Sequence, residues 1–402
     1  MGGMSPTEQE AVERAAAEPM LDQVLAWSAV NSGSRNLAGL ERMADLLADA
    51  FAALPGMLRL ESPTPVETVD SAGKNVHIQH GRHLHLTVRP TAPVQMLFTG
   101  HMDTVFGLDH AFQETRWLED GVLNGPGVAD MKGGIAVILA TLKAIEQSPF
   151  ADRLGYEVVI NSDEEVGSPA SAALLARSAR GKRAALTYEP AALPDGTLAG
   201  ARPGSGNFSI TIHGRSAHAG RNPEDGRNAL LAAADLALRL DRLKRDGLTV
   251  NPSRIDGGSP SNVVPDLAIL RVNLRPRTPD IEAEAKREID TLIAAVAAER
   301  DVRIEITGGF GRPPKPLTPE AEALFNLVKR AGIDLGQSIA WQPSGGVCDG
   351  NNIAACGVPV VDTMGVRGGK IHSMEEFLIV DSLPERAALS ALTILRLVQE
   401  GA

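Results

Sequence analysis

Cysteine is almost missing from this chain, with two among 402 residues. Cys348 and Cys356 share the segment GGVCDGNNIAACG, and no histidine stands between them. Two thiols in that arrangement make a poor zinc site, and a reducing compartment would leave both unpaired. We therefore expect free thiols at both positions.

Long apolar runs and basic runs are missing as well. No apolar run reaches the roughly 18 residues of a membrane span. The net charge is -11, so the chain lacks the attraction that nucleic acid or an anionic membrane surface would need. Residues 1–20 mix acids and alanines where a signal peptide needs an apolar core of at least about 7 residues. We expect a cytoplasmic protein that begins with a leader or first helix and has neither nucleic acid nor a membrane as partner.

Strand-like and helix-like segments alternate in the first half of the chain. Their order is strand 94–98, helix 134–147, strand 156–160, helix 169–179 and strand 184–188. This alternation predicts an α/β domain in which helices cover both faces of a mixed sheet. The length suggests two or three domains of about 150 residues each.

A different pattern begins near Pro203. The order becomes strand 208–214, helix 227–244, strand 248–255, strand 263–276, helix 280–298 and strand 302–308. This β-α-β-β-α-β order is typical of a ferredoxin-like α+β fold. The segment FGRPPKPLTP then leads the chain back. We predict one domain made of residues 1–202 and 314–402, with the ferredoxin-like domain inserted as residues 203–313.

A histidine and an aspartate follow the strand at 94–98. His101 and Asp103 stand two positions apart in the run GHMDTVF, so their side chains share one face of an extended chain. That spacing suits a metal ligand and the group that orients its ring.

Acidic residues follow in two further segments. Asp130 lies in the glycine-rich turn GPGVADMKGG and could bridge two cations with its two oxygens. The turn lacks the GK[ST] ending and the GxGxxG spacing of phosphate-binding loops, which disfavours a nucleotide-binding protein. Glu164 and Glu165 follow a strand and point in different directions, so one can bind metal while the other faces the substrate.

Glu189 and His372 complete a set of five potential metal ligands. Glu189 stands in TYEPA after a short strand, and His372 stands in GVRGGKIHSMEEF. With His101, Asp130 and Glu165, they indicate a site for two zinc ions. Glu164 is the candidate general base, because it is next to a ligand but outside the ligand set.

Taken in order, these segments resemble a known family. The runs GHMDTVFG, GPGVADMKGG, DEEVGS, YEPA, GRSAHAG and KIHS look like those of the dinuclear zinc exopeptidases and deacylases. That family contains aminoacylases, succinyl-diaminopimelate desuccinylase and glutamate carboxypeptidases, and the YEP form around Glu189 is most similar to the last branch. The resemblance implies a zinc-peptidase catalytic domain, a lid that forms a homodimer, and two zinc ions per subunit, for which Co2+ or Mn2+ could substitute.

The same resemblance assigns the ligands. It implies that Asp130 bridges both ions, that His101 and Glu189 complete the ligands of one ion, and that Glu165 and His372 complete those of the other. It also implies that the loop containing Cys348 lines the substrate pocket.

Four residues of the inserted domain and its exit match family positions that contact the substrate. His218, in GRSAHAG, is expected to reach the partner subunit's site and stabilise the oxyanion; the alternative is a surface histidine. Asn262 and Arg275 match substrate-holding positions, Arg275 for an α-carboxylate. Arg312 matches an arginine near the substrate's glutamate, and an arginine that pins the linker is an equal alternative.

These expectations describe a cytoplasmic, dimeric zinc carboxypeptidase. It would hydrolyse the amide next to a free C-terminal carboxylate in a small peptide or N-acyl amino acid, and release glutamate. An N-acyl amino acid deacylase or a dipeptidase is the alternative, because it would share every ligand. A metal-free binding scaffold would need a lost ligand or base, and none is missing.

Four other histidines cluster at His77, His80, His83 and His85. They suggest a second metal site, but His83 and His85 alternate as on one face of a strand. We expect a hairpin with exposed histidines instead.

Overall fold

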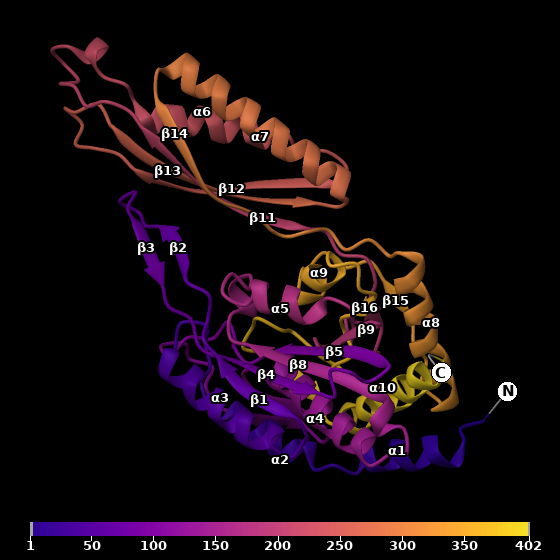
Figure 1. Cartoon of the computed structure of the whole chain (residues 1–402). Coiled ribbons are helices and arrows are strands. Elements are labelled where there is room, and N and C mark those ends of the chain that lie inside the picture. The colour runs from indigo at the N-terminus through magenta and orange to yellow at the C-terminus, as the bar shows by residue number, and fades with distance from the viewer. Residues whose placement is uncertain (1–2, 401–402) are drawn as a thin grey trace.

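The computed structural model describes residues 3–400 and shows two units, each built on its own sheet (Figure 1). The main domain comprises the elements before β11 and after β14, and the lid comprises β11 to β14. The central sheet of the main domain has the order β1 (Met57–Glu61), β4 (His83–Val88), β8 (Leu154–Asn161), β5 (Val94–His101), β9 (Ala184–Thr187) and β16 (Val360–Val361). It is mixed, because β8, β5, β9 and β16 run parallel while β1 and β4 pair antiparallel.

Helices cover both faces of this sheet, as the sequence predicts. Successive side chains of a strand point to opposite faces. Met96 and Phe98 therefore join one core, while Leu97 joins another. The first core is closed by α1 (Pro6–Ala16), α2 (Met20–Ser28), α3 (Leu37–Phe51), α4 (Gly133–Glu146), α8 (Pro319–Asp334) and α10 (Ser382–Glu400). The second is closed by α5 (Ala172–Ala179) and α9 (Asp349–Ala354).

Helix α4 is buried along its whole length. Lys143 and Glu146 are its only charged residues, and every uncharged residue is buried against neighbouring helices and the sheet. A helix that is apolar on all sides is typical of a domain interior. At its start, a Cβ on Gly134 would meet the main-chain oxygen of Tyr188 at 2.0 Å. Glycine therefore lets the turn before α4 pack closely against the end of β9.

The lid has the ferredoxin-like fold that the sequence predicts. Its elements are β11 (Ser205–His213), α6 (Ala229–Asp241), β12 (Leu248–Gly257), β13 (Leu267–Pro276), α7 (Pro279–Arg300) and β14 (Arg303–Arg312). The strand order is β12-β13-β11-β14, and neighbouring strands pair antiparallel. Both helices pack on the sheet and form a separate hydrophobic core with it.

Smaller elements complete the structure. One short sheet has the order β17 (Gly368–Gly369), β18 (Phe377–Ile379), β7 (Val122–Asn124) and β6 (Arg116–Glu119), and another pairs β10 (Leu198–Ala199) with β15 (Trp341–Gln342). Short helical turns occupy Val128–Lys132, Ala151–Arg153, Glu164–Val166 and Pro223–Asp225. A hairpin of β2 (Val66–Val69) and β3 (Asn75–Ile78) rises toward the lid (Figure 1), where Arg271 donates a hydrogen bond to Val69 O at 2.7 Å.

Two linkers join the lid to the main domain, and they run side by side. Arg202 and Lys315 exchange main-chain hydrogen bonds of 2.9 and 3.0 Å in an antiparallel bridge. The side chain of Asn351, in α9, donates to the carbonyl oxygens of both Pro203 and Pro313 at 2.8 Å. Helix α9 therefore clamps the entry and the exit of the lid together.

The histidine cluster differs from the sequence expectation. His77 is exposed on β3, but His80 and His83 are buried. His85 lies between Glu61 and Glu157, with its ring nitrogens 2.7 and 2.6 Å from their carboxylates. The prediction of a hairpin with exposed histidines is wrong for these three residues. His83 and His85 lie on β4, an interior strand of the sheet, and His80 lies before it with its ring 3.3 Å from Arg35 Nη1.

Within residues 3–400, no helix combines the length and the apolar character that crossing a membrane requires. Both cysteines are free thiols, as expected.

Candidate metal centre

His101 and the acidic turn at residues 163–165 lie together because β5 and β8 are parallel and end at the same edge of the sheet. The Cα partner of His101 is Asn161, the last residue of β8. Glu164 and Glu165 form a single helical turn directly afterwards. The carboxyl ends of parallel strands are where open α/β sheets place their ligands.

Asp103 connects His101 to the acidic turn at residues 163–165 through hydrogen bonds. Its carboxylate accepts hydrogen bonds from the main-chain nitrogens of Glu164 and Glu165 at 3.1 and 3.2 Å, and from Ser34 Oγ at 2.7 Å. Its main-chain oxygen lies 3.0 Å from His101 Nδ1, and its carboxylate lies 3.4 Å from the same nitrogen. A carbonyl oxygen only accepts, so Nδ1 carries the hydrogen and Nε2 keeps a lone pair for a metal.

The turn containing Asp130 is held by a residue that the sequence analysis missed. Glu376 is 1% exposed, and its carboxylate accepts hydrogen bonds from the main-chain nitrogens of Gly127, Ala129 and Asp130 at 3.0 to 3.2 Å. Gly127 has a φ of 72°, a left-handed conformation that favours glycine. The turn therefore aims the Asp130 side chain at the ends of β5 and β9.

The five predicted ligands converge in two groups that share Asp130. One oxygen of Asp130 lies 3.1 Å from His101 Nε2 and the other lies 3.3 Å from His372 Nε2. Glu189 is 3.6 Å from His101, and Glu165 is 3.0 Å from His372. His101 and Glu189 thus form one pair beside Asp130, and His372 and Glu165 form the other; the assignment of each pair to one ion stays a prediction.

The charges of the site favour bound cations. Burial raises the pKa of Glu165 to about 8, and the nearby Asp130 carboxylate adds to the shift. Burial also raises the pKa values of Glu164 and Glu189. Hydrogen bonds to Asp130 and Glu165 raise the pKa of His372 to about 11. Divalent cations would offset this crowded negative charge, and carboxylate and imidazole are ligands that zinc accepts. The residues present therefore fit a dinuclear zinc site.

A cleft of about 590 Å3 opens above these side chains. Asp130, Glu164, Glu189 and His372 are among the residues that line it. Part of the wall is apolar and consists of Pro190, Ala191, Ala192, Pro194, Val347 and Phe377. The cleft thus combines an acidic, metal-binding floor with a surface that suits an uncharged acyl or side-chain group.

Arg202 places a cation on one wall of the cleft, and the buried carboxylate that it binds also binds a lysine. Arg202 lines the cleft and donates two hydrogen bonds to Asp362, at 2.7 and 3.1 Å. Lys315 Nζ is 2.8 Å from the same carboxylate, so two cations share one buried anion. Cys348 also lines the cleft, as the resemblance implies, and burial raises the pKa of its thiol. A thiol held in its neutral form is a poor nucleophile.

The predicted lid residues His218 and Asn262 lie next to each other but away from the cleft of their own chain. The main-chain nitrogen of Ala219 donates to Asn262 O at 2.9 Å. Both side chains are exposed, and neither lines the cleft. The structure brings the two residues together on one edge of the lid.

The two predicted arginines have different surroundings. Arg275 is half-buried on β13, and its guanidinium donates to Gly345 O at 3.1 Å, beside Ser344 and Gly346 of the cleft wall. Arg312 is 4% exposed and does not line the cleft. Its guanidinium instead binds Glu164, at 2.5 Å. A contact between Arg312 and a substrate carboxylate is not supported, because the donors face the main domain.

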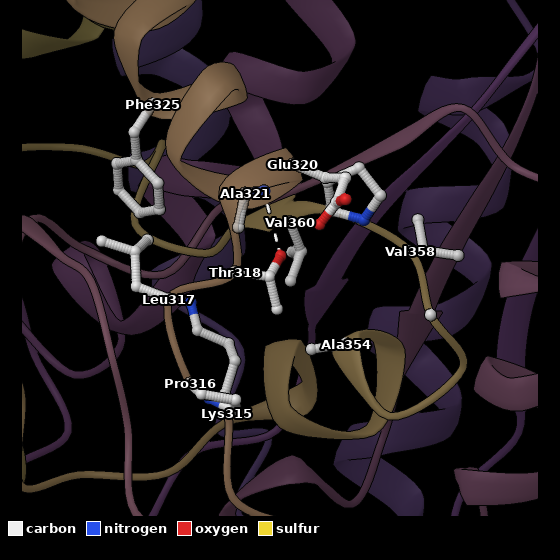
Figure 2. Close-up of a pocket in the computed structure, with 12 residues that line it drawn as sticks. Lys315, Pro316, Leu317, Thr318, Glu320, Ala321, Phe325, Ala354, Val358 and Val360 are labelled. Carbon is white, nitrogen blue, oxygen red and sulfur yellow. Dashed lines mark hydrogen bonds between the residues drawn. The ribbon is translucent and has the colours of Figure 1, made fainter.

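A smaller cavity of about 160 Å3 lies beside the exit linker (Figure 2). It is lined by the linker and the first turns of α8 on one side, and by Ala354 and residues 357–360 on the other. Thr318 caps α8 there by accepting a hydrogen bond from the main-chain nitrogen of Ala321 at 3.2 Å (Figure 2). None of the five ligands lines this cavity, so the wider cleft is the candidate site.

Comparisons with known proteins show a family to which most of the chain is similar. The family model for peptidase family M20/M25/M40 matches residues 97–396. Carboxypeptidase G2 from Pseudomonas sp. strain RS-16 is 30% identical over 390 residues, covering 94% of this chain and 92% of that protein. Succinyl-diaminopimelate desuccinylase from Maricaulis maris strain MCS10 is 30% identical over 325 residues, covering 75% of this chain and 80% of that protein.

Solved structures show the same fold. A tripeptidase from Staphylococcus aureus aligns with a TM-score of 0.70 at 23% identity, covering 99% of this chain and 100% of that one. At that identity the likeness speaks for the fold alone.

Proposed function

The chain belongs to peptidase family M20/M25/M40 and is a metallohydrolase, and from this premise we propose that it is a dinuclear zinc carboxypeptidase that releases a C-terminal glutamate. The observation that carries the proposal is the convergence of four candidate ligand side chains around a fifth, Asp130, with Glu164 beside them on the cleft. We propose a cytoplasmic location, in which both thiols would stay reduced.

The protein's own side chains divide the chemistry between them. His101, Asp130 and Glu189 would hold one zinc ion, and Asp130, Glu165 and His372 the other. Bound zinc would polarise the scissile carbonyl and lower the pKa of a water toward about 7. Glu164 takes a proton from the attacking water and delivers it to the leaving nitrogen. The Asp103 carboxylate holds the main chain of Glu164 and Glu165, so ligand and base keep a fixed relative position.

The preference for an acidic product is supported by the cationic wall of the cleft. Arg202 lines the cleft, and its buried partner Asp362 is shared with Lys315, which lies outside the cleft, so one negative charge is set against two positive charges behind this wall. Arg275 does not line the cleft itself, but its guanidinium donates to Gly345 O beside the cleft wall, and we propose that it binds the α-carboxylate from there. An N-acyl amino acid deacylase or a dipeptidase remains the second candidate, because similarity to the desuccinylase accompanies the similarity to the carboxypeptidase.

A substrate panel tests this function. We expect kcat/KM for an N-acyl-glutamate to exceed that for the matched N-acyl-leucine by at least about tenfold, the typical effect of one charge-assisted contact. The N-acyl-glutamate α-amide, which lacks the free α-carboxylate, serves as the control and should be a poor substrate. Steady-state rates with added zinc give the comparison. A preference for leucine would favour the general deacylase, and faster hydrolysis of unblocked dipeptides would favour the dipeptidase.

We also propose that the protein is a homodimer in which His218 serves the partner subunit's cleft. His218 and Asn262 lie on an exposed edge of the lid, outside the cleft of their own chain. The lid offers a surface for a second copy, because β12 is an edge strand and Leu231 and Leu238 of α6 are 56% and 63% exposed.

Subunit mixing tests the dimer. His218→Ala and Glu164→Gln proteins should each be nearly inactive, yet their heterodimer contains one intact composite site. Random exchange should therefore restore about a quarter of the wild-type activity, because half of the dimers are mixed and each has one complete site of two. Exchange is verified first with differently tagged subunits. Verified heterodimers without activity would place His218 in its own subunit's site or outside catalysis.

A further inference from the structure

We propose that Arg312 is the positioning residue for Glu164, so that the lid takes part in setting the orientation of the general base. The proposal rests on the proposed function, because it takes Glu164 as the base. It gives Arg312 a role that differs from substrate binding, and it links the base to the hinge of the lid.

The main chain of Arg312 belongs to the lid. Arg312 is the last residue of β14, and its Cα partner is Ser205, the first residue of β11. Its side chain leaves the lid and enters the main domain, where it is almost completely buried. One residue therefore has its backbone in one unit and its charge in the other.

The guanidinium holds Glu164 at two points. Nη1 donates to Glu164 Oε1 at 2.5 Å, and Nη2 donates to Glu164 O at 3.0 Å. The first contact fixes the carboxylate and the second fixes the main chain of the same turn. A planar guanidinium makes both contacts in one orientation, which the single ammonium of a lysine cannot do. Among the described residues, no hydrogen-bond donor meets Glu164 Oε2, and Glu164 lines the cleft.

Arg312 is also anchored independently of Glu164. Nη2 donates to Ser168 Oγ at 2.9 Å and lies 3.4 Å from Asp349 Oδ1. Asp349 is itself held, because Ser168 Oγ donates to Oδ1 at 2.5 Å and Asn161 Nδ2 donates to Oδ2 at 2.7 Å. These contacts hold the guanidinium in a buried position from which Nη1 donates to the base.

Two asparagines of helix α9 donate hydrogen bonds to the main chain on either side of Arg312. Asn352 Nδ2 donates to Gly311 O at 3.0 Å, and Asn351 Nδ2 donates to Pro313 O at 2.8 Å. A lid movement that breaks these two contacts would move the Arg312 backbone, and with it the donor that holds Glu164. The placement of the base is therefore coupled to the position of the lid.

Steady-state kinetics of Arg312→Ala test the proposal. We expect kcat to fall about 10- to 100-fold, with KM changed by less than about threefold, because a lost positioning contact acts on the chemical step. About 20 mM guanidinium chloride, far below denaturing concentrations, should restore part of kcat. Arg312→Lys, which keeps the charge and guards against a folding failure, should retain an intermediate kcat. Arg303→Ala, on the same strand but exposed, is the matched control and should leave kcat unchanged.

A double-mutant cycle separates this inference from the proposed function. In the Glu164→Gln background, Arg312→Ala should lower kcat by less than about twofold, because the group that it positions is already disabled. Full activity of Glu164→Gln would overturn the proposed base. An inactive Glu164→Gln protein beside a fully active Arg312→Ala protein would overturn this inference alone. A rise in KM at constant kcat, a folded Arg312→Ala protein without guanidinium rescue, or an equal loss in Arg303→Ala would also overturn it.

Discussion

Glu164→Gln should lower kcat by at least about 100-fold while the protein keeps its fold and both metal ions, because general-base catalysis typically contributes about 10²- to 10⁴-fold. Glutamine has the size of glutamate, and its amide oxygen can still accept the hydrogen bond that Arg312 donates to Oε1. It cannot take a proton from water. The loss should therefore appear in kcat, with thermal unfolding and zinc content close to those of the parent.

Glu165→Gln is the matched control for that result. Glu165 is the adjacent residue on the same turn, but its carboxylate lies 3.0 Å from His372 Nε2. Its substitution should release metal, as measured by elemental analysis after dialysis. If Glu164→Gln released zinc and Glu165→Gln kept it, the roles of base and ligand would have to be exchanged.

Asp130→Ala should release both metal ions together, and activity with them. The two oxygens of Asp130 face different histidines, His101 at 3.1 Å and His372 at 3.3 Å, so a single side chain serves both groups of ligands. Glu189→Ala is the comparison: of the two histidines, Glu189 lies beside His101, so its loss should weaken one ion preferentially. Retention of one full equivalent of zinc by dialysed Asp130→Ala protein would argue against a bridging carboxylate.

The sequence could single out the five candidate ligands because each one lies near the end of a strand or in a glycine-rich segment. In such places the direction of a side chain follows from local geometry. Glu376 could not be predicted in this way. It stands next to Glu375 in the run MEEF, yet Glu376 is 1% exposed and the Glu375 side chain is 76% exposed. Only the fold of the loop between β17 and β18 decides which of the two glutamates caps the Asp130 turn.

Arg312 and the histidines of β4 show the same limit. The contact between Arg312 and Glu164 joins residues 148 positions apart, and no periodic pattern encodes it. From the sequence alone, Arg312 could either contact the substrate or hold the linker, and nothing in the sequence decided between these two roles. His83 and His85 have the spacing of one face of a strand, but the pattern does not say whether that face is solvated. Strands β1 and β8 flank β4 and supply the two carboxylates around His85, and Ser162, directly after β8, lies beside the ring of His83.

The antiparallel bridge between Arg202 and Lys315 has a consequence for how the chain tolerates change in length. The polypeptide leaves the main domain and returns to it at neighbouring positions, so for the folding of that domain the whole lid is equivalent to the loop of a hairpin. Closing such a loop becomes only slowly more costly with size, by about 0.6 kcal/mol for each doubling of its length. Insertions or fused domains at the solvent-facing turns of the lid should therefore cost the main domain little stability, provided that Arg312 still reaches Glu164.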